Sequence, residues 1–172
     1  MFVDAPETEG PNYERAFGLR PDVYRAWQEL HKTIKAGADL RRHELATLAA
    51  ARRLRSSYCS LAHGKLLADE FYDADTIAAF PEGLTAEDRA VIAFAERIVD
   101  DASSITQAEI DELRAHGLSD EAIVNVVLAA TARCFFSKTL DALGAQPDAS
   151  YGELPANLRD ALTVGRPIAT AP

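Results

Sequence analysis

The chain has 172 residues and a formal net charge of −9; 48% of its residues are hydrophobic and 26% are charged. This is the composition of a soluble globular protein, and the acidic balance without a block of lysine or arginine argues against binding to nucleic acid. The first residues lack the basic start and apolar run of a signal peptide, and the longest apolar stretch, 122–132, is interrupted by Asn125 and followed by Arg133. We therefore expect a cytoplasmic protein without a membrane span, whose two cysteines are reduced at rest.

Helical patterns are found throughout the chain, and no segment shows the alternation of a β-strand. Residues 1–20 contain several prolines and glycines and are predicted to be irregular. Helices are predicted from Pro21 to Gly37, with one apolar face, and from about Leu40 to Leu54, where alanine and leucine are frequent. Ser56 or Ser57 is the expected N-cap of the next helix.

Capping patterns predict three further helix starts, at Thr85, Thr106 and Ser119. The last two of these helices are expected to end at Gly117 and Gly144, because glycine is the preferred residue just beyond a helix.

Short apolar or helical pieces are expected near 76–80 and 155–163. At least six helices and no sheet make the predicted fold an all-α helical bundle. We expect one domain at 21–145, preceded by the irregular segment and followed by a tail over 146–172 that is a candidate to wrap a neighbouring subunit.

Cys59 and His63 form the strongest chemical pattern in the sequence. They lie four residues apart, so a helix places the thiol and the imidazole on one face, one turn from each other. In the first turn of a helix a thiolate also faces free N–H groups and the positive end of the helix dipole. The imidazole can take up the thiol proton. Cys59 is therefore predicted to be reactive, whereas Cys134, beside Phe135 and Phe136, is expected in the core or an interface.

Other polar residues near this pair carry weaker signals. The Ser56 hydroxyl, three residues before Cys59, is placed either to donate to the thiolate or only to cap the helix. Glu44, near a helix start, resembles a partner of the helix dipole. His31 and His43 have no spacing partner and are interpreted as surface or structural residues. No close ligand pair such as H-x3-H or C-x2-C accompanies these side chains, so neither a metal nor another cofactor is predicted.

The spacing of four of these residues resembles a known signature. Glu44, eleven residues, and then Ser56-x-x-Cys59-x-x-x-His63 is similar to the E-x11-C-x2-C-x3-H pattern of alkylhydroperoxidase D and its relatives in the carboxymuconolactone decarboxylase superfamily. The difference is that Ser56 stands where that pattern has its first cysteine.

The last long helical run, from Asp120 to Gly144, resembles the closing helix of the peroxidase-related branch of that superfamily. The resemblance covers about residues 20–145. It implies an all-α fold that assembles into homo-oligomers, as trimers or larger rings.

The resemblance also implies an antioxidant activity of the peroxiredoxin type, the reduction of hydroperoxides by a pair of cysteines. Carried over by position, Cys59 is the cysteine linked to the glutamate and the histidine, and His63 with Glu44 is the proton relay. A serine cannot resolve a sulfenic acid, so the implied chemistry uses one cysteine. Its partners are a small hydroperoxide and an external thiol or thiol protein that resolves oxidised Cys59.

Two other functions stay open. One is a lactone decarboxylase or hydrolase in which His63 and Glu44 act as acid and base; the other is an oligomeric scaffold or redox sensor with a degenerate site. Glu44 also lies roughly 15 Å along the helix axis from the turn that precedes Cys59. A simple hairpin would separate the two residues, so their contact would require a long loop, a steep helix crossing or a neighbouring subunit.

Overall fold

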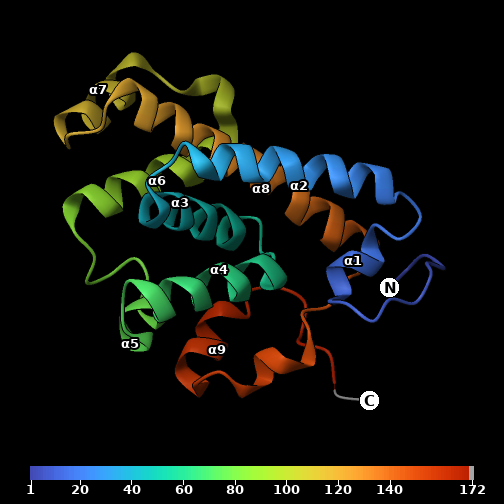
Figure 1. The fold of residues 1–172 in the computed structure, drawn as a ribbon. Helices are drawn as coiled ribbons and strands as arrows, with labels where there is room; N and C mark the ends of the chain where they lie inside the picture. The colour runs from blue at the N-terminus through green and yellow to red at the C-terminus, as the bar shows by residue number, and fades with distance from the viewer. Residues whose placement is uncertain (171–172) are drawn as a thin grey trace.

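A computed structural model describes residues 1–170, and these are all-α, with no β-strand among them (Figure 1). The α-helices are α1 (Asn12–Ala16), α2 (Pro21–Ala36), α3 (Leu40–Arg53), α4 (Ser57–Glu70), α5 (Ala74–Ala78), α6 (Ala86–Asp101), α7 (Gln107–Ala115), α8 (Asp120–Leu143) and α9 (Ala156–Leu162). Two 3₁₀ helices are η1 (Ala102–Ser104) and η2 (Ala149–Glu153). The predicted all-α fold is confirmed. The last two residues of the expected C-terminal tail, 171 and 172, lie outside the described residues.

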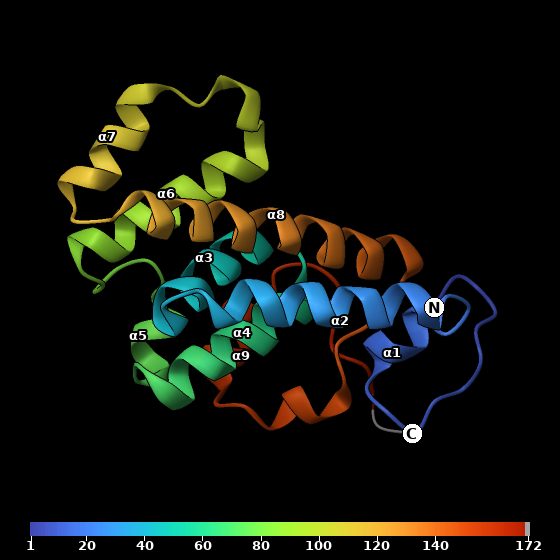
Figure 2. The ribbon, with the colours of Figure 1, turned by 45° about the horizontal axis from the view of Figure 1, so that its top comes forward.

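Helix α3 forms the centre of the fold, between α4 on one side and α6 and α8 on the other (Figure 1). Every residue of α3 from 43 to 51 is buried. Most of this stretch is alanine or leucine, and small side chains let neighbouring helix backbones approach closely. Helix α2 runs along α8 in both views (Figure 2). The site residues on α3, α4 and α8 therefore converge on the interior.

The predicted helix ends are confirmed where capping residues set them. The Ser119 hydroxyl accepts the backbone N–H of Ala122 at 3.2 Å and starts α8. Gly144 ends α8 with φ of 76°, a left-handed conformation that favours glycine. At the start of α7 the N–H of Thr106 donates to Glu109 Oε2 at 2.7 Å, the return bond of a capping box.

The N-terminal end of the chain is more ordered than the sequence predicts, whereas α9 confirms the helical piece expected near 155–163. Residues 1–20, expected to be irregular, contain α1, whose neighbour Phe17 is buried against the ring of Phe136. The described part of the tail packs on its own chain: α9 lies against α4 and α5, and Leu158 and Leu162 are buried in the main core. These contacts are non-local, so proline- and alanine-rich sequence gave no local signal for them.

Among residues 1–170, α8 is the one helix that is long and apolar enough to cross a membrane by length and composition. It packs against α3, α6 and α2, and Arg133 in its middle is buried. A core helix of a globular domain can have the same length and composition, and α8 packs as such a helix.

Candidate active site

Cys59 and His63 lie where the sequence predicts, on one face of α4. Cys59 is in the first turn of the helix and is buried, with 2% of its surface exposed. Both residues line a cavity of about 410 Å³. The thiol is therefore beside an open space rather than enclosed by core side chains.

The hydrogen-bond partner of the thiol is Arg133, which sequence reasoning missed. Its guanidinium reaches in from the middle of α8, and Nη1 donates to Cys59 Sγ at 3.3 Å. The side chain is buried, with 4% exposed, and its Nε has no partner among the described residues. A buried guanidinium without a carboxylate partner is costly, so its hydrogen bond to the Cys59 sulfur is a stabilising contact for this charge. The signal in the sequence that could have identified Arg133 is its position as a charged residue inside the apolar run of α8.

His63 forms a hydrogen bond with a buried carboxylate, that of Glu44. Its Nδ1 lies 2.5 Å from Glu44 Oε2, and Lys35 Nζ donates to Glu44 Oε1 at 2.8 Å. Burial by itself would raise the pKa of Glu44, but the hydrogen bonds from His63 and Lys35 and the charge of Lys35 outweigh it and hold this pKa well below its usual range. Burial, together with the charge of Arg133, lowers the pKa of His63 despite the carboxylate. The pair is therefore an ionised Glu44 and a neutral imidazole.

This arrangement selects the tautomer of His63. An ionised carboxylate can only accept, so the proton of the imidazole lies on Nδ1 and is donated to Glu44. The lone pair of Nε2 is left free, and His63 lines the cavity beside Cys59. His63 is thus equipped as a proton acceptor, with Lys35 and Glu44 behind it as a fixed ion pair.

The expected difficulty in bringing Glu44 to the site does not arise, because Glu44 meets His63 instead of Cys59. Helices α3 and α4 pack against each other after a tight turn in which Arg55 has φ of 57°. His63 lies about two helical turns beyond this turn, and the long Glu44 side chain covers the remaining offset. One chain forms the contact, so neither a long loop nor a neighbouring subunit is required.

Ser56 occupies the predicted N-cap position of α4, but its side chain does neither of the expected tasks. Its Oγ is buried, makes no capping hydrogen bond and has no partner among the described residues, so it does not donate to Cys59. Cys134 is half-buried on α8 and does not line the cavity; burial raises the pKa of its thiol.

The other two histidines near the site are expected from the sequence at the surface or in a structural role. His43 has 3% of its surface exposed, which leaves the structural role, and both of its ring nitrogens lack a partner among the described residues. His31 lines the cavity and stacks on Trp27, with ring centroids 5.5 Å apart. Burial lowers the pKa of each of them to about 4. Among residues 1–170 no three His, Cys, Asp or Glu side chains gather as metal ligands.

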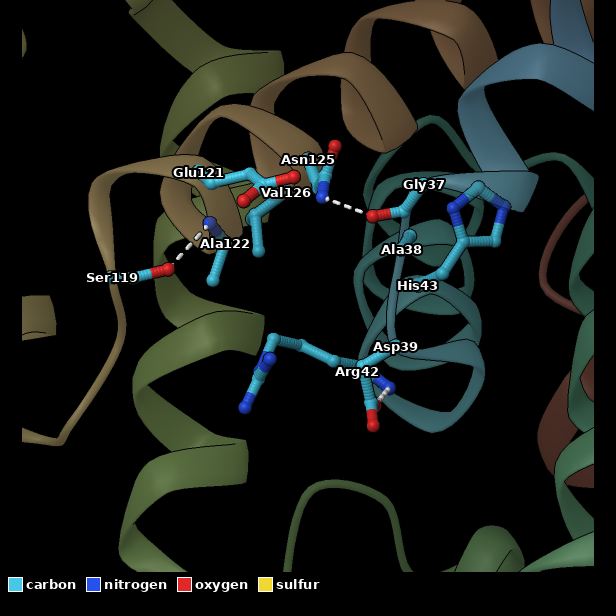
Figure 3. Close-up of a pocket in the computed structure, with 10 residues that line it drawn as sticks. All are labelled: Gly37, Ala38, Asp39, Arg42, His43, Ser119, Glu121, Ala122, Asn125 and Val126. Atoms are coloured by element: carbon cyan, nitrogen blue, oxygen red, sulfur yellow. Dashed lines mark hydrogen bonds between the residues drawn. The ribbon is translucent and has the colours of Figure 1, made fainter.

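A smaller cavity of about 210 Å³ lies where α3 and α8 begin (Figure 3). Three of its polar side chains are engaged in the fold. The side chain of Asn125 donates to the carbonyl of Gly37 at 2.8 Å, and Asp39 and Ser119 cap their helices. The ring of His43 points away from Ser119 (Figure 3). None of the four site residues predicted from the sequence lines this cavity.

No family model and no curated protein matches the chain. Solved structures do share its fold. An uncharacterized peroxidase-related protein from Ralstonia eutropha JMP134, described as an alkylhydroperoxidase AhpD core, has a TM-score of 0.73 at 22% identity, over 82% of this chain and 78% of that chain. A peroxidase-related protein from Silicibacter sp. TM1040 has a TM-score of 0.72 at 19% identity, over 83% of this chain and 79% of that chain.

The debrominase Bmp8, solved in complex with 2,3,4-tribromopyrrole, has a TM-score of 0.70 at 19% identity, over 88% of this chain and 81% of that chain. One fold therefore carries more than one activity. At these identities the likeness concerns architecture, and it agrees with the resemblance of the Glu44, Cys59 and His63 spacing. The chain has the all-α fold of the alkylhydroperoxidase D core.

Proposed function

We propose that the protein is a thiol-dependent hydroperoxide reductase with Cys59 as its redox nucleophile. The observation that carries the proposal is the buried Arg133 guanidinium hydrogen-bonded to the Cys59 sulfur at a cavity. A positive charge beside a thiol favours the thiolate, which is the reactive form. His63, held by Glu44, is available to move the proton.

In the first half-reaction the thiol proton passes to Nε2 of His63, and the Cys59 sulfur attacks the outer oxygen of the hydroperoxide. The S–O bond forms as the O–O bond breaks. Sulfur is oxidised to a sulfenic acid, and the departing oxygen is released as an alcohol after taking the proton from His63. Glu44 stabilises the imidazolium that exists between these two steps, and Arg133 stabilises the anionic sulfur.

The second half-reaction needs a thiol from outside the chain, because Ser56 replaces the first cysteine of the resembled motif and Cys134 does not line the cavity. An external thiol attacks the sulfenic acid, which releases water and leaves a mixed disulfide on Cys59. A further external thiol attacks this disulfide, which restores the Cys59 thiol and releases an external disulfide.

The two alternatives account for less of the site. A scaffold with a degenerate site would enclose Cys59 beneath apolar side chains, whereas Cys59 borders a cavity that Arg133 and His63 also line. A lactone decarboxylase would use His63 and Glu44 but gives no role to the contact between Arg133 and Cys59.

The first test is the oxidation of Cys59 itself. We expect reduced protein to consume hydrogen peroxide or cumene hydroperoxide in the presence of a thiol, with dimedone trapping a sulfenic acid at Cys59. Cys59→Ser should lose this activity, and Cys134→Ser should retain it as the matched control. Unchanged peroxide consumption in Cys59→Ser contradicts the proposal, and turnover of a carboxylactone by Cys59→Ala would favour the decarboxylase.

The same assay tests the role of Arg133. Arg133→Met keeps much of the side-chain volume but removes the charged donor, and we expect the oxidation of Cys59 at pH 7 to slow by about ten- to a hundred-fold, the effect of one charged hydrogen bond. The control is Arg25→Met, on the exposed face of α2. Equal oxidation rates in the two variants would show that Arg133 does not activate the thiol.

A further inference from the structure

Six aromatic rings follow one another around the Cys59 cavity and form what we call the aromatic belt. In spatial order its members are His31, Trp27, Phe136, Tyr13, Tyr58 and Tyr151, all of which line the cavity. Successive ring centroids lie 5.5, 5.1, 6.0, 5.7 and 6.1 Å apart. Each pair is within the distance of a favourable aromatic contact.

The belt is assembled from five elements that are distant in the chain: α1, α2, α4, α8 and η2. With Tyr24, which also lines the cavity, it holds four of the five tyrosines and the one tryptophan of the sequence. Trp27, Tyr58 and Phe136 are buried in a hydrophobic cluster, as aromatic side chains often are. All six rings also border an open space of about 410 Å³, and Tyr13 and Tyr151 are only half-buried.

Polar groups also line this cavity, and two of them are engaged with other parts of the protein. The Tyr58 hydroxyl donates to Asp148 and accepts the N–H of Tyr13, so its ring is the part left for a ligand. Arg133, the cation of the cavity, donates from Nη1 to the Cys59 sulfur. An anionic ligand would compete with that sulfur for Arg133, and a cationic ligand would be repelled by it.

On the basis of the proposed function, we infer that the substrate is an organic hydroperoxide whose organic group contains a flat, uncharged aromatic ring. The belt holds the ring, and the peroxide group meets Cys59, His63 and Arg133. The cavity volume lies in the range of small-molecule sites, which combine apolar walls with a few convergent polar groups.

Binding can be measured without chemistry, because Trp27 is the sole tryptophan and is part of the belt. We would titrate the reduced wild-type protein with cumyl alcohol and with its cyclohexyl analogue, which has a ring of similar size but no π-system, and follow tryptophan fluorescence. We expect a saturable change for both and a Kd about three- to ten-fold lower for the aromatic alcohol, the gain of ring-on-ring contacts beyond burial. Equal dissociation constants, or no saturable change, would overturn the inference.

Two variants locate the binding. Tyr13→Leu and Tyr151→Leu, which remove a ring from the middle and from the end of the belt, should each weaken cumyl alcohol binding and reduce its advantage over the cyclohexyl analogue. The control is Phe71→Leu, an exposed ring outside the cavity, which should bind as the wild type does. If both belt variants fold, by circular dichroism, and keep the wild-type selectivity, the belt does not hold the ring.

The binding and activity tests fail independently. A protein that selects the aromatic alcohol but consumes no hydroperoxide would contradict the proposed function and retain the aromatic ligand. A protein that reduces hydroperoxides equally well whether their ring is aromatic or saturated, and binds both alcohols alike, would retain the function and overturn this inference.

Discussion

Three histidines lie in or near the candidate site, His43 buried and His31 and His63 partly buried, and burial makes a charge on each of them unfavourable. Burial lowers the pKa of His31 and of His43 to about 4, and burial with the charge of Arg133 lowers that of His63. His43 is the clearest case, because it is almost fully buried and neither ring nitrogen has a partner among the described residues. Burial in the folded state thus favours the neutral form of these rings.

Acid should therefore destabilise the protein while most carboxylates are still ionised. The pKa of His43 is about 4 in the folded state against 6.5 for the free side chain, so the unfolded chain binds more protons between these values. The stabilisation is present above pH 6.5 and is lost as the pH falls towards 4. We expect His43 to account for about 2 kcal/mol of lost stability at pH 5.

The measurement is urea unfolding at pH 7 and at pH 5. His43→Leu should reduce the difference in stability between the two pH values, and His116→Leu, at the end of α7, should leave it as in the wild type. An undiminished difference in His43→Leu would show that another group causes the acid sensitivity.

At the scale of elements, the C-terminal segment packs through Val164 and Gly165 against the turn that leads into α4. The N–H of Gly165 donates to Ser57 Oγ at 2.7 Å, and Arg55 Nε donates to the carbonyl of Val164 at 3.3 Å. A Cβ atom at Gly165 would lie 1.9 Å from the carbonyl oxygen of Arg55. Only glycine fits so close to this backbone, and the first turn of α4 is where Cys59 lies.

Gly165→Ala should therefore push the segment off the turn and destabilise the fold by about 1–3 kcal/mol, the usual cost of overpacking. The matched control is Gly152→Ala, where an added Cβ meets nothing within 4 Å. Urea unfolding at neutral pH compares the two. A Gly165→Ala protein as stable as the control would mean that the segment does not pack on the turn in solution.

At the scale of the whole molecule, an apolar face lies open between α2 and α8. Leu30, Leu128 and Phe135 are 53%, 39% and 44% exposed and line a groove of about 460 Å³ whose other members are nearly all apolar. A contiguous apolar surface of this kind is typical of an interface. We propose that copies of the chain meet at this α2–α8 face, in keeping with the oligomers that the sequence resemblance implies.

A charge on this face should break the assembly. We expect Leu128→Glu to shift the protein from an oligomer to a monomer in size-exclusion chromatography with light scattering, because a carboxylate buried in an apolar interface is strongly unfavourable. Leu19→Glu, at an exposed leucine outside the groove, should keep the wild-type mass. A monomeric wild type would contradict the proposal.

The sequence by itself determined the local features of this protein. Capping residues such as Thr106 and Ser119 act on the backbone within one turn, so they set helix starts without help from the rest of the fold. The placement of Cys59 and His63 on one face was equally predictable, because two residues four positions apart on a helix share a face. Glu44 was identified through the spacing of a known motif, and its contact with His63 follows from the packing of two consecutive helices.

Tertiary structure decided what surrounds that pair. Arg133 is 74 residues from Cys59 in the chain, and nothing local shows that its charge turns inward to the thiol. The aromatic belt draws its rings from five elements, and the C-terminal segment covers a turn more than a hundred residues earlier. Such groups meet because burying apolar helix faces brings distant segments together, and the periodicity that forms a helix does not specify which other helix it will touch.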